Sequence, residues 1–154
     1  MNNFANNLLP ENDISDLPAG AGILPYQTIQ AMIRNKKIQS NIPFVDGQVQ
    51  PASIDLRLGK FAYPVSTSFQ PSIGNTVLDK MKQLDEDYEK FKINLEDWAV
   101  LEKDRLYVIP LLETLDLQNT EIAGFANPKS STGRLDILTR LITDEGTAFD
   151  KVIK

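Results

Sequence analysis

A short segment in the last quarter of the sequence gathers hydroxyl and cationic side chains that could hold a phosphate group. Its residues are Lys129, Ser130, Ser131, Thr132, Gly133 and Arg134, and Pro128 precedes them. Proline and glycine interrupt regular structure, so the pattern predicts a turn-rich loop. Small side chains leave backbone N–H groups accessible, while hydroxyls and cations add donors for an anion. A solvated turn is the alternative that this composition leaves open.

The sequence contains no histidine and no cysteine, which excludes two common hydrolytic sites. Zinc-dependent nucleoside deaminases hold their metal with histidine and cysteine ligands, so this chain cannot build that site. A serine nucleophile activated by histidine is excluded for the same reason. Hydrolytic chemistry here would have to use carboxylates, hydroxyls, backbone groups and arginine.

Two segments of the sequence resemble motifs of one enzyme family. Residues 129–135, Lys-Ser-Ser-Thr-Gly-Arg-Leu, resemble the Arg-Ser-Ser-x-x-Arg-Leu motif of the dCTP deaminases, a branch of the dUTPase-like superfamily. Lys129 replaces the first arginine, and Gly133 stands where alanine is common. Residues 51–59, Pro-Ala-Ser-Ile-Asp-Leu-Arg-Leu-Gly, are similar to the Pro-Ala-Ser-Val-Asp-x-Arg-Leu-Gly segment of the same family. The motifs follow the family's order, and the resemblance covers roughly residues 22–150 and is strongest to a long alphaproteobacterial form.

This resemblance implies an enzyme that hydrolyses dCTP to dUTP and ammonia without catalytic zinc. It implies that Ser130 helps to orient the attacking water and that Arg134 supports its polarisation. The substrate-binding residues that it implies in this segment are Lys129, Ser130, Ser131, Thr132, Gly133 and Arg134. Of these, Lys129, Ser130 and Ser131 would line the phosphate path. Magnesium would bind through the triphosphate oxygens, as is usual for nucleotide enzymes.

Two further residues match the family less closely. Asp150 stands near the family's deoxyribose-contacting aspartate, although Lys151-Val152-Ile153 departs from the usual Pro-Gly-Trp that follows it. Thr143 either approaches the pyrimidine or is a hydroxyl at the edge of the core. The family's catalytic glutamate lies in a strand after the aspartate-containing turn, and we find no match to that strand before Lys154. We therefore expect the domain to be truncated at its C-terminal end and inactive alone.

Two other functions stay open at this point. A dUTPase would release pyrophosphate from the same scaffold, whereas a non-catalytic half of a longer protein would bind nucleotides or serve in assembly. The resemblance implies a trimer or pseudo-trimer with shared active sites and dTTP as a possible inhibitor. The net charge of −5 argues against nucleic acid as a partner.

Composition and periodicity predict the elements that would position these residues. The chain of 154 residues fits one domain, without a signal sequence or a membrane span, and its lack of cysteine suits the cytoplasm. We expect a flexible arm at 1–21 and a β domain at 22–154, with a helix near 25–36. Alternation at residues 53–58 predicts a strand that buries Ile54, Leu56 and Leu58 and places Asp55 and Arg57 on the opposite face. These two residues either form an exposed ion pair or, as the resemblance implies, belong to a strand that frames the subunit interface and active site.

The middle of the chain predicts mostly short strands. A helix is expected at about 76–88, and the strands are expected at 61–70, 90–96, 100–101, 106–109 and 111–117. Many short strands with few helices favour a mainly-β barrel or jelly roll. The resemblance implies the distorted jelly-roll barrel of the dUTPase-like superfamily.

Overall fold

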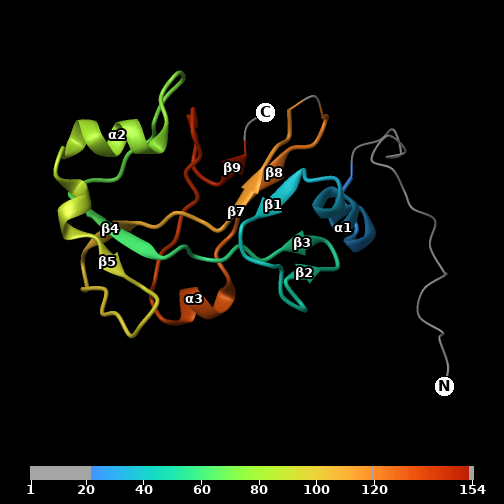
Figure 1. Ribbon diagram of the computed structural model, residues 1–154, viewed down its shortest axis with the longest axis horizontal. Helices are drawn as coiled ribbons and strands as arrows, with labels where there is room; N and C mark the ends of the chain where they lie inside the picture. Colours follow the sequence, from blue (N-terminus) through green and yellow to red (C-terminus); the bar gives the residue numbers. More distant parts are fainter. Residues whose placement is uncertain (1–21, 119, 153–154) are drawn as a thin grey trace. The chain divides into compact units, whose positions relative to one another are not determined.

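The computed structural model describes residues 22–118 and 120–152, so the expected arm at 1–21 lies outside the described residues. Chain contacts divide the described part into two compact units. Unit 1 contains the residues up to Leu58 and Leu111–Asp116, and unit 2 contains Gly59–Pro110 and the residues from Leu117 onward. Figure 1 shows short strands with a few short helices, which confirms the expected mainly-β class. The expectation of a single, truncated β domain stays a prediction.

Unit 1 is built from one helix and two antiparallel strand pairs. Helix α1 is Tyr26–Arg34, within the expected range, and it buries Ile29 and Met32 on one face. Burying an aliphatic side chain of this size contributes roughly 1.5–3 kcal/mol, which anchors the helix. The strands pair as β1 with β7 and β2 with β3, and their bounds are β1 Ile38–Ser40, β7 Glu113–Leu115, β2 Val49–Gln50 and β3 Ser53–Ile54.

The strand expected at residues 53–58 is shorter than its alternating pattern predicts. β3 ends at Ile54, and Leu58 forms only an isolated bridge, with its side chain 59% exposed. The expectation of one buried apolar face through Leu58 is therefore wrong. The physical reason is that the backbone N–H and the guanidinium of Arg57 bond to the Glu113 carboxylate, which turns this part of the chain away from a regular ladder.

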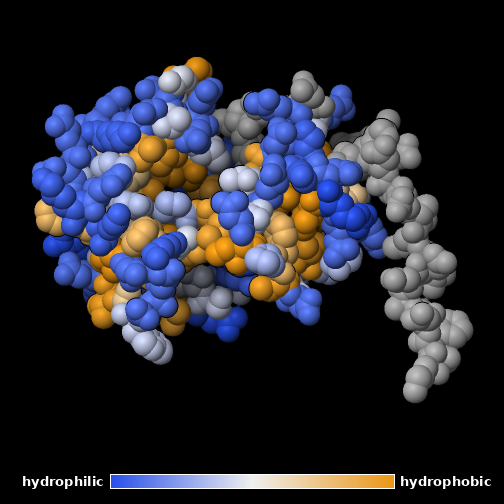
Figure 2. Space-filling view, viewed as in Figure 1, coloured by the Kyte–Doolittle hydropathy of each residue, from blue (hydrophilic) through white to orange (hydrophobic). Residues whose placement is uncertain are grey.

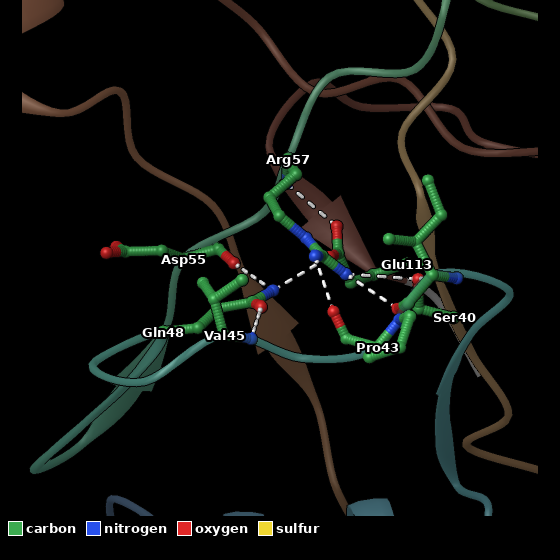
Figure 3. A network of polar contacts seen from close by, with 8 residues as sticks. Ser40, Pro43, Val45, Gln48, Asp55, Arg57 and Glu113 are labelled. Carbon is green, nitrogen blue, oxygen red and sulfur yellow. Dashed lines mark hydrogen bonds and ion pairs between the residues drawn. The ribbon is translucent and has the colours of Figure 1, made fainter.

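A buried ion pair inside unit 1 joins Arg57 to Glu113 (Figure 3). Arg57 Nε lies 2.7 Å from Glu113 Oε1, and the Arg57 backbone N–H donates to Oε2 at 2.8 Å. Gln48 Nε2 adds a third donor at 2.7 Å, and the Glu113 side chain is 0% exposed. The remaining guanidinium nitrogens donate to Ser40 Oγ and to the carbonyls of Ile42 and Pro43. An exposed ion pair with Asp55 is one of the two interpretations of Arg57 from the sequence, whereas the structure shows Arg57 in a buried ion pair with Glu113.

Acid unfolding of the protein should depend on Glu113. Burial favours a higher pKa for Glu113, but the hydrogen bonds from Arg57 and Gln48 and the Arg57 charge outweigh burial, so the pKa is lowered. A lowered folded pKa means stability that is present above the unfolded value of about 4.3 and is lost as the pH falls through the folded value. We expect Glu113→Gln to cost about 1–3 kcal/mol at neutral pH and to remove this acid-dependent loss.

Urea unfolding between neutral and acid pH checks this prediction. Glu102→Gln is the matched control, because Glu102 also pairs with an arginine Nε but its side chain is 64% exposed. The control should keep both the stability and the acid slope of the wild type. An acid slope that is unchanged in Glu113→Gln would contradict the role of the buried pair.

Unit 2 contains one three-stranded and one two-stranded antiparallel sheet, together with short helices. In the larger sheet β4 (Phe61–Val65) lies between β5 (Ile93–Asn94) and β6 (Leu106–Val108). The smaller sheet pairs β8 (Gly124–Phe125) with β9 (Lys151–Val152). The helical elements are α2 Val77–Leu84, the 3-10 helix η2 Tyr88–Phe91 and α3 Ser130–Arg134. The buried apolar side chains of this unit include Ala62, Met81, Tyr88 and Leu117.

The helix expected at 76–88 ends early. Its start is well defined, because Thr76 Oγ1 accepts from the Asp79 N–H at 3.0 Å and the Asp79 carboxylate accepts from the Thr76 N–H at 3.1 Å. Asp85 is extended and ends the helix at Leu84, before the expected end at residue 88. The expected strands survive in shortened form as β4, β5, β6 and β7, whereas residues 100–101 are not in a strand.

Apolar side chains remain at the surface among the hydrophilic ones (Figure 2). In unit 2 they include Trp98 and, around the small sheet and α3, Phe125, Leu135 and Leu138. Single exposed apolar residues are normal on proteins of this size. None of the helices in the described ranges is long enough and apolar enough to span a membrane.

Candidate active site

The Lys129–Arg134 segment forms a short helix instead of the expected loop. Helix α3 follows Lys129, which occupies the N-cap position without a side-chain cap. The Lys129 carbonyl accepts from the N–H groups of Thr132 and Gly133, at 3.0 and 3.3 Å. Serine, threonine and glycine have weak intrinsic preference for helix interiors, which is why their composition predicted a turn. The side chains of Ser130–Arg134 therefore project from a single short helix.

The hydroxyl groups of α3 are accessible to a ligand. Ser130 and Ser131 are exposed, and Thr132 is half-buried. Over residues 22–118 and 120–152, none of these three hydroxyls takes part in a hydrogen bond with another side chain or with the backbone. Hydroxyls that are not used inside the fold remain available as donors to a phosphate or a water molecule.

Arg134 adds a cation in the last turn of α3. Its side chain is exposed, and it forms no ion pair with a carboxylate of the described residues. Before it, Gly133 has no heavy atom within 4 Å of the point where a Cβ would stand. Alanine, which the resembled motif often has at this place, would therefore fit, and the departure at Gly133 does not distort the segment.

The Asp150 carboxylate is held in a fixed orientation by two donors. Oδ1 accepts from the Leu141 N–H at 2.8 Å, and Oδ2 lies 2.6 Å from Arg140 Nε. The Asp150 N–H donates in turn to the Leu141 carbonyl at 2.9 Å, which supports a backbone with φ of 62° at Asp150. The side chain is 25% exposed, so a ligand could still reach the carboxylate.

Thr143 lies in a turn, and both its backbone carbonyl and its side-chain hydroxyl have hydrogen-bond partners in the fold. Its carbonyl accepts from the Gly146 N–H at 3.0 Å, and its Oγ1 makes a long contact of 3.5 Å with the Lys151 carbonyl. The side chain is half-buried. This environment suits a hydroxyl at the edge of the core, and contact of Thr143 with a pyrimidine stays a prediction.

The small sheet connects α3 to Asp150. Phe125 pairs with Lys151 in the β8–β9 ladder, and the Ala126 N–H donates to the Asp150 carbonyl at 2.9 Å. Asp150 is therefore fixed to the strand that leads into α3. Thr143, by contrast, shares no hydrogen bond with α3 among the residues that the structure describes. Backbone hydrogen bonds of the small sheet thus link Asp150 to the strand that precedes α3. The catalytic and binding roles of Asp150, Thr143 and the residues of α3 stay predictions.

Sequence reasoning assigned no role to Arg140, although Arg140 holds the Asp150 carboxylate. The two residues are too far apart in the sequence for helical or strand spacing to bring them together. A turn at Thr143 and Gly146 reverses the chain, and the hydrogen bonds between Leu141 and Asp150 hold its two arms together. No local signal could have revealed this pair.

A metal site built by the protein itself is not found in the described part of the chain. No group of three or more carboxylate, histidine or cysteine side chains there could hold a metal ion. Binding of magnesium through a triphosphate, which the resemblance implies, stays a prediction.

Comparisons with known proteins give a family model and similar solved structures. Residues 20–154 match the family model of the 2'-deoxycytidine 5'-triphosphate deaminase N-terminal domain. The chain is also similar to the crystal structure of 2'-deoxycytidine 5'-triphosphate deaminase from Agrobacterium tumefaciens, with 45% identity and a TM-score of 0.78. That match covers 85% of this chain but only 38% of the solved chain, and it confirms the expected dUTPase-like fold. A search of curated proteins gave no significant match.

Proposed function

The chain belongs to the 2'-deoxycytidine 5'-triphosphate deaminase family, and on this premise we propose that it is the N-terminal part of an enzyme that hydrolyses dCTP to dUTP and ammonia. The observation that carries the proposal is the family match over residues 20–154, which includes the Lys129–Arg134 segment. The open hydroxyls and the exposed cation of α3 support it, because they suit an anionic nucleotide in a chain of net charge −5.

Hydrolytic deamination needs a base for the water, a donor for the leaving amine and stabilisation of the developing charge. In the proposed mechanism the Ser130 hydroxyl orients the water, and the Arg134 guanidinium polarises it and steadies the catalytic carboxylate. The water oxygen bonds to C4 of the cytosine while one water proton passes to the base, the C4=N3 double bond opens, and the base delivers that proton to N3. The proton of the new C4 hydroxyl then passes through the same base to the exocyclic amine, the C4–N bond to that amine breaks as C4=O forms, and ammonia leaves.

We propose further that the base lies outside this sequence. Two of the late carboxylates already have structural roles, because Asp144 Oδ1 accepts from the Val77 N–H at 2.7 Å and Asp150 is held by Arg140. Glu145 is exposed and precedes the turn at Asp150, so its position differs from that expected for the glutamate. The chain spans 38% of the solved deaminase, which leaves ample sequence in such a protein for the base.

Family membership also suggests which residues contact the phosphates, the sugar and the base of the substrate. Lys129, Ser130 and Ser131 would contact the phosphates, Thr132 and Gly133 would also contact the substrate, and Mg²⁺ would bind through the triphosphate oxygens. Asp150 would accept a hydrogen bond from the deoxyribose, and Thr143 would approach the pyrimidine. We also propose a trimeric or pseudo-trimeric assembly, sensitivity to dTTP and a cytoplasmic place in deoxynucleotide metabolism.

The phosphate role of α3 leads to a prediction about ligand preference. Replacing both Ser130 and Ser131 by alanine in the full-length protein should weaken dCTP binding by about a hundredfold or more, because each of the two lost hydrogen bonds to a charged group is worth roughly 1.5–3 kcal/mol. Binding of deoxycytidine, which has no phosphate, should change little. Calorimetric titration with both ligands measures the difference.

The matched control is the double replacement of Ser66 and Ser68, which are also exposed in unit 2. It should leave the affinity for dCTP unchanged. Equal weakening of dCTP and deoxycytidine in the Ser130/Ser131 variant would show that α3 does not contact the phosphates.

Product analysis separates the proposed reaction from its alternatives. A deaminase releases ammonia from dCTP and leaves the triphosphate intact, whereas a dUTPase releases pyrophosphate from dUTP. A non-catalytic subunit would bind dCTP or dTTP without turnover of either. Assays of ammonia and pyrophosphate with both substrates, alongside titration, therefore distinguish the three.

A further inference from the structure

We propose that Arg140 is a positioning residue that fixes the Asp150 carboxylate as the acceptor for the 3'-hydroxyl of the substrate's deoxyribose. This inference rests on the proposed function and extends it to a residue outside the motifs. Arg140 Nε lies 2.6 Å from Asp150 Oδ2, and the Leu141 N–H holds the other carboxylate oxygen at 2.8 Å. Two donors on two oxygens leave the carboxylate a single orientation.

Arg140 is itself held in place by an aromatic ring. Its guanidinium carbon lies 5.3 Å from the centroid of the Phe149 ring, within the range of a cation–π contact. Phe149 directly precedes Asp150, so ring, guanidinium and carboxylate form one local cluster. Because Arg140 contacts both Phe149 and Asp150, its side chain has already lost conformational freedom before the substrate binds. The cluster is therefore preorganised before a ligand arrives.

The cluster leaves the carboxylate able to accept another hydrogen bond. An ionised carboxylate has about four lone-pair sites, and Arg140 and Leu141 use two of them. The Asp150 side chain is 25% exposed, so a hydroxyl can reach a remaining site. The positive charge of Arg140 also offsets the negative charge of Asp150, which reduces the repulsion that an unpaired carboxylate would exert on a triphosphate. The geometry therefore leaves Asp150 able to accept from a hydroxyl, such as that of a deoxyribose.

The test compares two substrates that differ only in that hydroxyl. The kcat/KM values of the full-length protein are measured for dCTP and for 2',3'-dideoxycytidine triphosphate, in the wild type and in Arg140→Gln. We expect the preference for dCTP to fall by about tenfold in the variant, mainly through a higher KM. Asp150→Asn should lose a similar preference, and the double variant should lose little more because both changes act on one contact.

Control variants separate positioning from a general effect. Arg105→Gln removes an exposed arginine whose Nε lies 2.9 Å from Glu102, and it should leave the preference unchanged. Arg140→Lys keeps the charge and one donor and should restore part of the preference. The lysine variant also carries the test if the glutamine variant does not fold.

The possible outcomes are distinct. An unchanged preference in the Arg140 variants, or equal loss for both nucleotides, would overturn this inference and leave the proposed function standing. A wild-type protein that does not deaminate dCTP would overturn the proposed function and this inference with it.

Discussion

Arg134→Ala in the full-length protein is expected to lower kcat for dCTP by two orders of magnitude or more, about 3 kcal/mol of transition-state stabilisation. The reason is that the proposed role of Arg134 is exerted on charge that develops as the water attacks. The side chain is exposed and has no ion pair within the described residues, so its loss removes no contact that holds the fold. The variant should therefore unfold in urea at the wild-type midpoint.

Arg34→Ala is the matched control for this experiment. Arg34 is also an exposed arginine in the last turn of a helix, α1, and lies in unit 1. It should keep wild-type kcat and KM. A purified, folded Arg134→Ala protein with kcat near that of the wild type would show that this arginine is not part of the reaction.

The second large effect concerns the chain itself. We expect the isolated 154-residue chain to release no measurable ammonia from dCTP, because the proposed base lies beyond it. Loss of proton transfer alone typically lowers the rate by about 10²–10⁴-fold. The small β8–β9 sheet also has only two strands, and unpaired strand edges favour aggregation. Both effects act in the same direction.

The measurement is kcat/KM of the isolated chain and of the protein extended to its natural stop, at equal concentration of folded protein. Residual dCTP binding by the isolated chain, measured by titration, would show that α3 still works as a ligand site. Comparable kcat/KM for the two proteins would contradict the proposal and would point to Asp144 or Glu145 as the base.

The class of fold and helix α1 could be predicted because their signals are local. The apolar spacing at Ile29 and Met32 places a helix at α1, and the Lys129–Arg134 segment is recognisable from contiguous residues. Local patterns of this kind report on one element at a time. They therefore predicted α1 correctly, without any knowledge of how the chain folds back on itself, and the site at Lys129–Arg134 stays a prediction.

Long-range contacts explain what could not be predicted. Arg57 finds its partner, Glu113, on a strand far along the chain, and this contact shortens the strand that its neighbours predict. Arg140 reaches Asp150 only because a turn brings the chain back. No propensity or period encodes such pairs. The helix at α3 is a further case, since weak helix formers adopt a helical turn in their tertiary context.

Release of labelled ammonium from dCTP tests the central claim most directly. The full-length protein is given dCTP that carries ¹⁵N in its exocyclic amine, with Mg²⁺ present, and the products are followed by NMR and by chromatography of the nucleotides. The account predicts ¹⁵N-ammonium and dUTP in equal amounts, with no pyrophosphate formed from dCTP. Nucleotide that keeps its ¹⁵N label, whether it is unchanged or cleaved to the monophosphate, would contradict the account.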